Sequence, residues 1–326
     1  MSFINIVALH IVLNLIIYYS FGPLKKFINV YDFPDNKRKL HSEPIPLIGG
    51  FVFLINIIFF LSLEFSSISK VELNIIICSS FFLFVGILDD KFNLGPYTKF
   101  LFLIIALFIF FNFTENTIIT HLKVYGYTLY LGNGLDIFFS ILCVMLFVNA
   151  FNLFDGINLQ SSSYGLFFLL FLIYKTFFFK IAIVLLIPLL LIIYLNNKNK
   201  IFMGDSGTLF LGSIISLIVI VNYTKFNLLE VDEIFLLMFL PGIDMLRLFI
   251  QRVVSKKNPF IGDREHLHHY FLTIYSYKKT ILFIILLSII PSILNIYLDS
   301  KFVIIIFLTM YLFLIFFFKK KLKKKN

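Results

Sequence analysis

The chain has 326 residues, of which 60% are hydrophobic and 14% are charged. A soluble domain of this length needs far more polar surface, so the composition excludes a soluble globular protein and favours one embedded in a bilayer. The net charge of +10 does not require a nucleic-acid partner, because basic residues at the inner ends of membrane helices account for it.

The first apolar run, from Phe3 to Phe21, is not typical of a secretory signal peptide. No basic segment precedes it, it is long for the apolar part of a signal, and no small-residue cleavage site follows. Lys25 and Lys26 come directly after it. We therefore interpret this run as a first transmembrane helix whose C-terminal end lies inside.

Further apolar runs follow along the chain, and a helix needs about 20 apolar residues to cross a hydrocarbon core of about 30 Å. The sequence predicts an all-α polytopic membrane protein with about 10–11 transmembrane helices. These would form a single integral membrane domain over residues 1–326, with a basic tail at 319–326. The loop at 114–133 is compatible with a short β-hairpin. The expected spans are 3–21, 47–65, 71–88, 97–113, 134–151, 161–175, 178–195, 207–223, 232–251, 279–297 and 302–318.

Basic residues predict the orientation of these spans. With the N-terminus outside, most Lys and Arg residues fall on the inside face, including the tail from Lys319 to Lys325. Because cytoplasmic loops carry the excess of basic residues, we expect the N-terminus outside and the C-terminus in the cytoplasm. The tail suits an anionic inner leaflet, so membrane lipids are expected partners. The lysines left outside are Lys70, Lys123, Lys175, Lys180, Lys225 and Lys301.

The long polar stretches all fall on the inside face in this topology, and nothing of comparable density falls outside. Their convergence predicts one site formed by cytoplasmic loops. The stretches are 31–50, 89–97, 149–160, 198–207 and 256–270.

Asp89 and Asp90 end one span at its inner side. The helix macrodipole disfavours carboxylates at a C-terminus, and adjacent carboxylates repel each other. One interpretation is a solvated turn in which they pair with Lys91. The other is a carboxylate pair that holds a cation or a proton, which we favour because acids at a membrane edge are costly without a partner.

The segment NAFNLFDGIN, residues 149–158, ends another span. On a helix, Asn149, Asn152 and Asp155 would share one face through their spacing of three residues. Three oxygen-bearing side chains at the inner end of an apolar helix are not typical of packing. Gly156 then allows a turn and a close approach of the backbone to a ligand.

The segment FMGDSGTLFLG, residues 202–212, places Asp205 between two glycines just before a span. Asp205 or Ser206 could cap that helix. Alternatively, the N–H groups at the helix N-terminus could bind phosphate. Carboxylate and amide oxygens are also the ligands that Mg²⁺ prefers.

Two basic segments complete the inside face. The segment DREHLHHY, residues 263–270, contains Arg264, His266, His268 and His269, and an anion-binding loop is favoured over a zinc site because no Cys or second His group accompanies it. In the first inside loop, Lys39 and His41 either set the topology or contact phosphate. The residues together predict a Mg²⁺-dependent phosphotransferase acting on a lipid carrier, without identifying the sugar.

These motifs resemble those of the polyprenyl-phosphate N-acetylhexosamine-1-phosphate transferases, the superfamily that includes MraY, and most closely its WecA-type branch. The resemblance covers nearly the whole chain: PDNKRKLHSEPIPLIGG, LDDKFNL, NAFNLFDGIN, IFMGDSGTLFLG, PGIDM and DREHLHHY occur in this order. It implies transfer of a sugar 1-phosphate from a UDP-N-acetylhexosamine, such as UDP-GlcNAc, to undecaprenyl phosphate, with release of UMP. The enzyme would lie in the bacterial cytoplasmic membrane and start a cell-envelope glycan of the O antigen, enterobacterial common antigen or teichoic acid type.

The resemblance also implies roles for individual residues. Asn152 and Asp205 would be Mg²⁺ ligands, with Mn²⁺ as a substitute, and Asp89 and Asp90 would be catalytic, activating or orienting the lipid phosphate. The residues near the nucleoside would be Asn149, Asp155, Gly156 and Asn158. The residues that contact the diphosphate or the sugar would be Arg264, His266, His268 and His269, together with Lys39 and His41.

The chain departs from the WecA-type pattern where that branch often reads DGIDGL and this sequence reads DGINLQ. Asn158 therefore replaces an acid and Leu159 replaces a glycine, which removes a carboxylate beside the nucleoside position. The metal positions are unchanged.

Two alternative functions compete with this interpretation. The first is the phospho-MurNAc-pentapeptide transferase of peptidoglycan synthesis, against which the histidine loop argues. The second is a transporter, suggested by Asp136, Asp244 and Arg247 inside expected spans, although Asp244 and Arg247 can simply pair. Transporters place polar groups near the midplane, often in repeated halves, and no repeat is visible in this chain. The sequence leaves a homodimer open.

Overall fold

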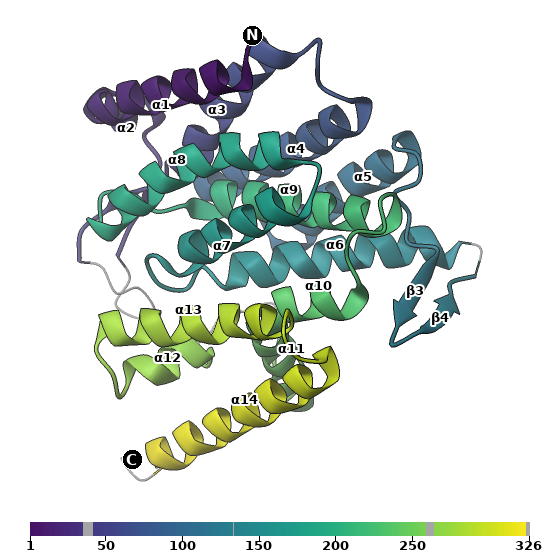
Figure 1. Ribbon diagram of the computed structural model, residues 1–326. Coiled ribbons are helices and arrows are strands. Elements are labelled where there is room, and N and C mark those ends of the chain that lie inside the picture. The colour runs from purple at the N-terminus through teal and green to yellow at the C-terminus, as the bar shows by residue number, and fades with distance from the viewer. Residues whose placement is uncertain (35–41, 133, 259–263, 324–326) are drawn as a thin grey trace. The chain divides into compact units, whose positions relative to one another are not determined.

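The computed structural model describes residues 1–34, 42–132, 134–258 and 264–323 (Figure 1). It contains two compact units, Met1–Leu229 and Glu230–Asn326, and each is described by itself. In the described residues both units are helical, apart from two small two-stranded sheets in the first unit. The predicted all-α architecture is confirmed.

The first unit begins with a bent pair of helices, α1 (Phe3–Tyr19) and α2 (Phe21–Ile28), whose axes differ by 73°. Lys25 and Lys26 lie in the last turn of α2, where the macrodipole favours cations. Strands β1 (Tyr31–Asp32) and β2 (Ile45–Pro46) then pair antiparallel. The amide of Phe202 donates to the carbonyl of Pro46 at 3.0 Å, which ties this sheet to the segment before α9.

The next helices carry the polar residues of the expected site. They are α3 (Gly49–Glu64), α4 (Lys70–Phe92), α5 (Pro96–Phe113), α6 (Leu135–Leu153), α7 (Gln160–Lys175), α8 (Phe179–Asn197) and α9 (Gly204–Thr224). Asn93 ends α4 in the left-handed conformation, and Pro96 begins α5 at the first helical position, where its missing N–H costs nothing. This short turn places the end of α4 beside the start of α5.

Helix α9 forms the core of the first unit and packs against α3, α4 and α6 (Figure 1). Every residue from Ser206 to Tyr223 is buried. Glycines permit the close approach at its N-terminal end. A Cβ added to Gly86 of α4 would lie 2.4 Å from the Cα of Ser206, and one added to Gly50 of α3 would lie 2.4 Å from the Ser206 side chain.

The expected hairpin is also present. Strands β3 (His121–Val124) and β4 (Tyr127–Tyr130) pair antiparallel, and the two residues between them, Tyr125 and Gly126, both have positive φ. Two such residues are typical of the tight turns that match the twist of a hairpin. The expected break near residue 178 is confirmed as well, because α7 ends at Lys175 and α8 begins at Phe179.

Five helices lie in the described residues of the second unit. They are α10 (Val231–Leu237), α11 (Phe239–Val254), α12 (Leu267–Leu272), α13 (Tyr277–Leu294) and α14 (Ser300–Lys323). The prediction of one span over 232–251 is wrong, since the chain breaks between α10 and α11 at Met238. Pro241 explains the break, because its ring disfavours a continuous helix but is tolerated in the first turn of a new one.

Seven helices in the described parts of the chain are long and apolar enough to cross a membrane: α4, α5, α6, α8, α9, α13 and α14. The bent pair α1 and α2 would make an eighth, and α3 is a shorter apolar helix. Each expected span coincides with a helix, except the broken one at 232–251. The expected number of 10–11 transmembrane helices is nevertheless too high for the described residues, because α3, α7 and α11 have only 16 residues each. The protein is therefore a multi-pass membrane protein, while the orientation of its termini stays a prediction.

Candidate active site

Asp90 is the partner of the N-terminus of α9. Its Oδ1 accepts a hydrogen bond from the amide of Asp205 at 2.8 Å, and its Oδ2 accepts one from the amide of Ser206 at 3.0 Å. The first residues of a helix have no partners of their own for these N–H groups. The expectation that Asp205 or Ser206 caps the helix is wrong, because the cap residue is Met203 and Asp90 supplies the acceptor. These two N–H groups are thus engaged within the protein, which corrects the idea that they bind phosphate.

Lys99 joins the other two acids of the cluster. Its ammonium lies 2.8 Å from Asp89 Oδ2 and also forms an ion pair with Asp205. The side chains of Lys99 and Asp89 are 17% and 12% exposed and that of Asp205 is 33% exposed, so the two carboxylates share one largely buried cation. The alternative partner Lys91 is exposed and lies over the ring of Phe92. Lys99 therefore joins Asp89 to Asp205, whereas Asp90 faces backbone amides, so Asp89 and Asp90 do not share this cation.

Asn152 approaches Asp205 from α6. Its side-chain amide donates to Asp205 Oδ1 at 3.1 Å and to Thr208 Oγ1 at 2.7 Å. Four helices, α4, α5, α6 and α9, therefore contribute Asp89, Lys99, Asn152 and Asp205 to one cluster. Asn149 is half-buried one turn earlier on α6.

Asp155 lies just past the end of α6 rather than on it, since α6 ends at Leu153. Its carboxylate accepts a hydrogen bond from Ser161 at the start of α7. Burial raises the pKa of Asp155 to about 6, and the nearby charge of Asp205 adds to this rise while the Ser161 hydrogen bond opposes it. Asp155 thus lies close enough to Asp205 to sense its charge. Gly156 follows in an exposed bend, as expected for a turn.

Asn158 faces the loop between α8 and α9. Its side-chain amide donates to Asn199 Oδ1 at 2.5 Å and to the carbonyl of Asn196 at 3.5 Å. The backbone amide of Leu159 donates to Asn196 Oδ1 at 2.6 Å. The residue that replaces the expected acid therefore ties two loops together, and its contact with a nucleoside stays a prediction.

Leu159 has a φ of +71°, a conformation that favours glycine. The WecA-type pattern that the chain resembles has glycine at this position, and the backbone has the conformation that glycine favours although the residue is leucine. The strain lies between Asp155 and α7.

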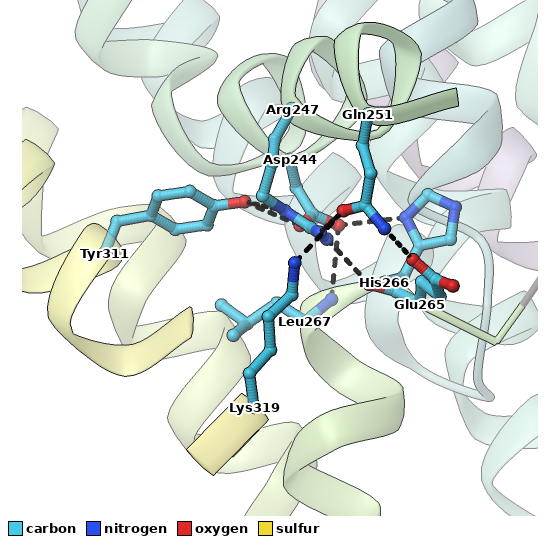
Figure 2. A network of polar contacts seen from close by, with 8 residues as sticks. All are labelled: Asp244, Arg247, Gln251, Glu265, His266, Leu267, Tyr311 and Lys319. Atoms are coloured by element: carbon cyan, nitrogen blue, oxygen red, sulfur yellow. Dashed lines mark hydrogen bonds and ion pairs between the residues drawn. The ribbon is translucent and has the colours of Figure 1, made fainter. Parts of the chain in front are cut away.

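In the second unit, Asp244 organises the histidine segment (Figure 2). Its Oδ2 accepts from His266 Nδ1 at 2.9 Å and from the amide of Leu267 at 3.3 Å. Its Oδ1 accepts from Arg247 Nη2 at 2.8 Å and from the Tyr311 hydroxyl at 2.8 Å. The predicted pairing of Asp244 and Arg247 is confirmed.

The three histidines lie at the start of α12. The rings of His266 and His268 are stacked, with centroids 5.4 Å apart, and those of His268 and His269 are 4.2 Å apart. Burial, together with the charges of the other two histidines, lowers the pKa of His268 well below its usual value. His268 is therefore neutral at physiological pH. Arg264 is exposed, and Lys39 and His41 lie outside the described residues.

Comparison with known proteins finds a family match over the part of the chain that carries the acid cluster. The model of a family described as "Glycosyl transferase family 4" matches residues 73–223, which include all four residues of the Asp89, Lys99, Asn152 and Asp205 cluster. The match spans just under half of the chain and supports the family that the motifs resemble. The protein is therefore a transferase, and the resemblance predicted from its motifs is confirmed.

Individual relatives agree with the family. The chain is 28% identical over 259 residues to the undecaprenyl-phosphate alpha-N-acetylglucosaminyl 1-phosphate transferase of Salmonella typhi, covering 74% of this chain and 69% of the relative. It is 29% identical over 279 residues to the protein of that name from Thermotoga maritima, covering 83% and 82%. It is also 29% identical over 292 residues to the phospho-N-acetylmuramoyl-pentapeptide-transferase of Dictyoglomus thermophilum, covering 82% and 88%.

The donor chemistry of the cluster fits a magnesium ion. Asp89 and Asp205 offer carboxylate oxygens, and Mg²⁺ is usually held by one or two carboxylates together with water and substrate phosphates. The described residues contain no group of three or more acids, histidines or cysteines gathered for a metal, so a family member of this kind would rely on substrate oxygens to complete the coordination. Asn152 donates its amide N–H to Asp205, so its oxygen would become a ligand only if the amide turned over.

Sequence reasoning missed Lys99 and the role of Asp244. A signal for Lys99 exists, because a cation in the first turn of a helix is disfavoured by the macrodipole in the same way as Asp89 at a helix end. Asp89 and Lys99 are each disfavoured by the dipole of their own helix, and one short turn separates the two helices. An ion pair between them is therefore expected. For Asp244 the sequence suggested the pairing with Arg247, but nothing in the spacing indicates His266.

Proposed function

We propose that the protein transfers a sugar 1-phosphate from a UDP-N-acetylhexosamine to undecaprenyl phosphate and releases UMP. The product is a lipid-diphosphate-linked sugar that begins a cell-envelope glycan. The observation that carries the proposal is the convergence of Asp89, Lys99, Asn152 and Asp205 from four helices in the region matched by the family model. The names of the relatives supply the donor and acceptor classes.

The reaction exchanges one phosphorus–oxygen bond for another. An oxygen of the lipid phosphate attacks the phosphorus that bears the sugar, and the bond between that phosphorus and the uridine phosphate breaks. UMP leaves with the electron pair of the broken bond. Catalysis of such a transfer consists mainly of positioning and of neutralising charge on the phosphate oxygens.

We propose that Asp205 and Asn152 would hold the Mg²⁺ ion, with the Asn152 amide turned so that its oxygen faces the ion, and that Mn²⁺ can replace it. Bound there, the ion would supply positive charge to the donor diphosphate. Lys99 lies between the two carboxylates and can share its ammonium with an arriving phosphate oxygen. The Lys99 ammonium thus gives the cluster a positive charge even before a substrate binds.

The two adjacent acids have different roles in this proposal. Asp90 holds the N-terminus of α9 through backbone amides and positions Asp205. Asp89 is held by the Lys99 side chain, which can move. Asp89 is therefore the acid of the pair that orients the lipid phosphate or accepts its proton.

The remaining predicted residues keep the roles that the resemblance implies. Asn149, Asp155, Gly156 and Asn158 lie at or just after the end of α6 and are assigned to the nucleoside. Arg264 and the three histidines, with Lys39 and His41, are assigned to phosphate and sugar oxygens. The site faces the cytoplasm of a bacterial inner membrane in this proposal, where nucleotide sugars are present.

A second donor is favoured by one observation. The similarity to a phospho-N-acetylmuramoyl-pentapeptide-transferase is 29% over 292 residues, as high as that to the Thermotoga maritima relative. A UDP-MurNAc-pentapeptide is therefore the competing donor.

The decisive experiment measures UMP released by the purified protein in detergent with Mg²⁺. We expect release from a UDP-N-acetylhexosamine only when undecaprenyl phosphate is added. Release without the lipid would contradict the proposed acceptor. A panel containing UDP-GlcNAc, UDP-GalNAc and UDP-MurNAc-pentapeptide then identifies the donor.

A matched pair of variants tests the cluster. Asp205→Asn should abolish UMP release, whereas Asp136→Asn should leave it unchanged. Asp136 also lies in the first turn of a membrane helix, α6, but at the end opposite to Asn152. Near-normal release by Asp205→Asn would remove this residue from the site.

A further inference from the structure

The carboxylate of Asp244 is buried, with 5% of the residue exposed, and it receives hydrogen bonds from three directions. Arg247 comes from the same helix, Tyr311 comes from α14, and His266 and Leu267 come from the segment that begins α12 (Figure 2). Arg247 Nη2 also donates to the carbonyl of Glu265 at 2.6 Å. Asp244 therefore binds the amide of Leu267 and Arg247 binds the carbonyl of Glu265, so the backbone is held on both sides of His266.

This arrangement takes the place of a helix cap. His266 is the residue before α12, and its own side chain does not cap that helix. The amide of Leu267, the first helical residue, donates instead to Asp244 Oδ2. Because helix starts leave such amides without partners, the acid fixes the point at which α12 begins.

The same oxygen also selects the form of the imidazole ring. A carboxylate oxygen can only accept, so Nδ1 of His266 must carry the proton in the 2.9 Å contact. Nε2 is then the nitrogen that accepts in the neutral ring and donates in the charged ring. Carboxylates that orient histidines in this way control both ring position and tautomer.

We propose that Asp244 is a positioning residue, which orients His266 and the start of α12 so that the histidine loop presents one fixed arrangement to a substrate phosphate. The inference rests on the proposed function for its consequence in catalysis. Its structural part, the tautomer of His266, is independent of that function.

Asp244→Asn is the informative substitution because it preserves shape. An amide keeps one accepting oxygen and replaces the other with a donating NH₂ group. If the oxygen stays with Arg247 and Tyr311, the NH₂ group faces His266 Nδ1, and the ring must move its proton to Nε2. Tyr311→Phe is the matched control, because it also removes a hydrogen bond from this carboxylate but leaves the His266 contact in place.

The first measurement is the nitrogen NMR spectrum of the full-length protein labelled with ¹⁵N-histidine, with His266→Gln used for assignment. We expect the wild type and Tyr311→Phe to carry the proton on Nδ1, and Asp244→Asn to carry it on Nε2. A wild-type ring protonated on Nε2 at high pH would overturn the proposal, and this result does not depend on whether Asp244→Asn folds.

The second measurement is the rate of UMP release at varied donor concentration. We expect kcat/KM of Asp244→Asn to fall by about ten- to a hundred-fold, because His266 and the start of α12 lose the carboxylate that orients them. Tyr311→Phe should keep the wild-type kcat/KM even if it lowers Tm. If Asp244→Asn lowers Tm but keeps the wild-type kcat/KM, the residue has a structural role only.

The two measurements distinguish a failure of the proposed function from a failure of the proposed role of Asp244. If the wild type releases no UMP from any donor, the proposed function fails, while the nitrogen spectrum still decides whether Asp244 orients the ring.

Discussion

Asp90 holds Asp205 through the backbone amide of Asp205, at 2.8 Å, and not through its side chain. The side chain of Asp205 is left to face Lys99 and Asn152. Two acids that are neighbours in sequence, Asp89 and Asp90, therefore act on the same residue from different sides. One fixes the start of the helix that carries Asp205, and the other shares a cation with it.

The first prediction separates these two acids. Asp90→Asn replaces an acceptor with a donor that faces a backbone N–H, and we expect the free energy of unfolding to fall by about 1–3 kcal/mol along with a loss of activity. Asp89→Asn should lose activity with little change in stability. Thermal unfolding in detergent and UMP release measure both effects. An Asp90→Asn variant as stable as the wild type would contradict the backbone role.

The second prediction concerns Lys99. Lys99→Met leaves Asp89 and Asp205 without their shared cation, and we expect a loss on the order of 2 kcal/mol in stability and about a hundred-fold in activity. The cost is below that of a fully buried pair because the Asp205 side chain is 33% exposed. Lys91→Met is the control, since Lys91 is exposed, and it should behave as the wild type. Equal effects of the two variants would count against the cluster.

The third prediction tests the contact between α4 and α9. Gly86→Ala introduces a methyl group 2.4 Å from the Cα of Ser206, so the two helices must separate. We expect the free energy of unfolding to fall by about 1–3 kcal/mol. Activity should also fall, because Asp90 would no longer reach the backbone amides of α9. Gly22→Ala, which meets nothing within 4 Å, should be neutral. Retention of full activity by Gly86→Ala would show that the helices tolerate a wider spacing.

The fourth prediction uses the strained backbone at Leu159. Leu159→Gly and Leu159→Ala both remove the side chain, but only glycine relaxes at a φ of +71°. We expect the glycine variant to be more stable than the alanine variant by about 1 kcal/mol. The unfolding midpoints of the two variants measure this difference. Equal midpoints would contradict the left-handed conformation of residue 159.

The fifth prediction concerns pH. The pKa of Asp155 is raised to about 6, above its ordinary value of 3.8, because burial disfavours the charged form. The folded state therefore binds the proton more tightly than the unfolded state does. The stability linked to this proton is complete below about pH 4 and is lost as the pH rises through about 6.

Asp155→Asn copies the protonated acid and still accepts the Ser161 hydrogen bond. We expect its stability relative to the wild type to increase between pH 4 and pH 7, by up to about 3 kcal/mol, since one pKa unit corresponds to about 1.4 kcal/mol. Thermal unfolding of both proteins across this range measures the difference. A difference that does not vary with pH would show that the acid is not perturbed.

The helices could be predicted from the sequence because a bilayer requires long apolar runs. The exception, at 232–251, shows what hydropathy misses, since Pro241 changes the backbone without reducing the apolar character of the run. The candidate residues Asp89, Asn152 and Asp205 could be predicted because polar groups at membrane helix ends are conspicuous. Lys99 was missed because a single lysine near a helix end is usually assigned to topology.

The division of roles could not be predicted from the motif. Asp89 and Asp90 are identical in type and adjacent, and only the direction in which α4 meets α9 decides which one faces an amide. The same limit applies to His266 and Asp244, which are 22 residues apart. Periodicity gives the face of one helix but not the neighbour that a side chain meets.

The buried position of α9 has a consequence for how the protein is made. Asp90 and the amide it holds are 115 residues apart, so several helices are synthesised and enter the membrane before α9 is available. Until then the faces of α3, α4 and α6 that contact α9 lack their partner. Insertion of α9 brings Asp205 beside Lys99 and Asn152. The acid cluster can therefore form only after more than 200 residues of the chain have been made.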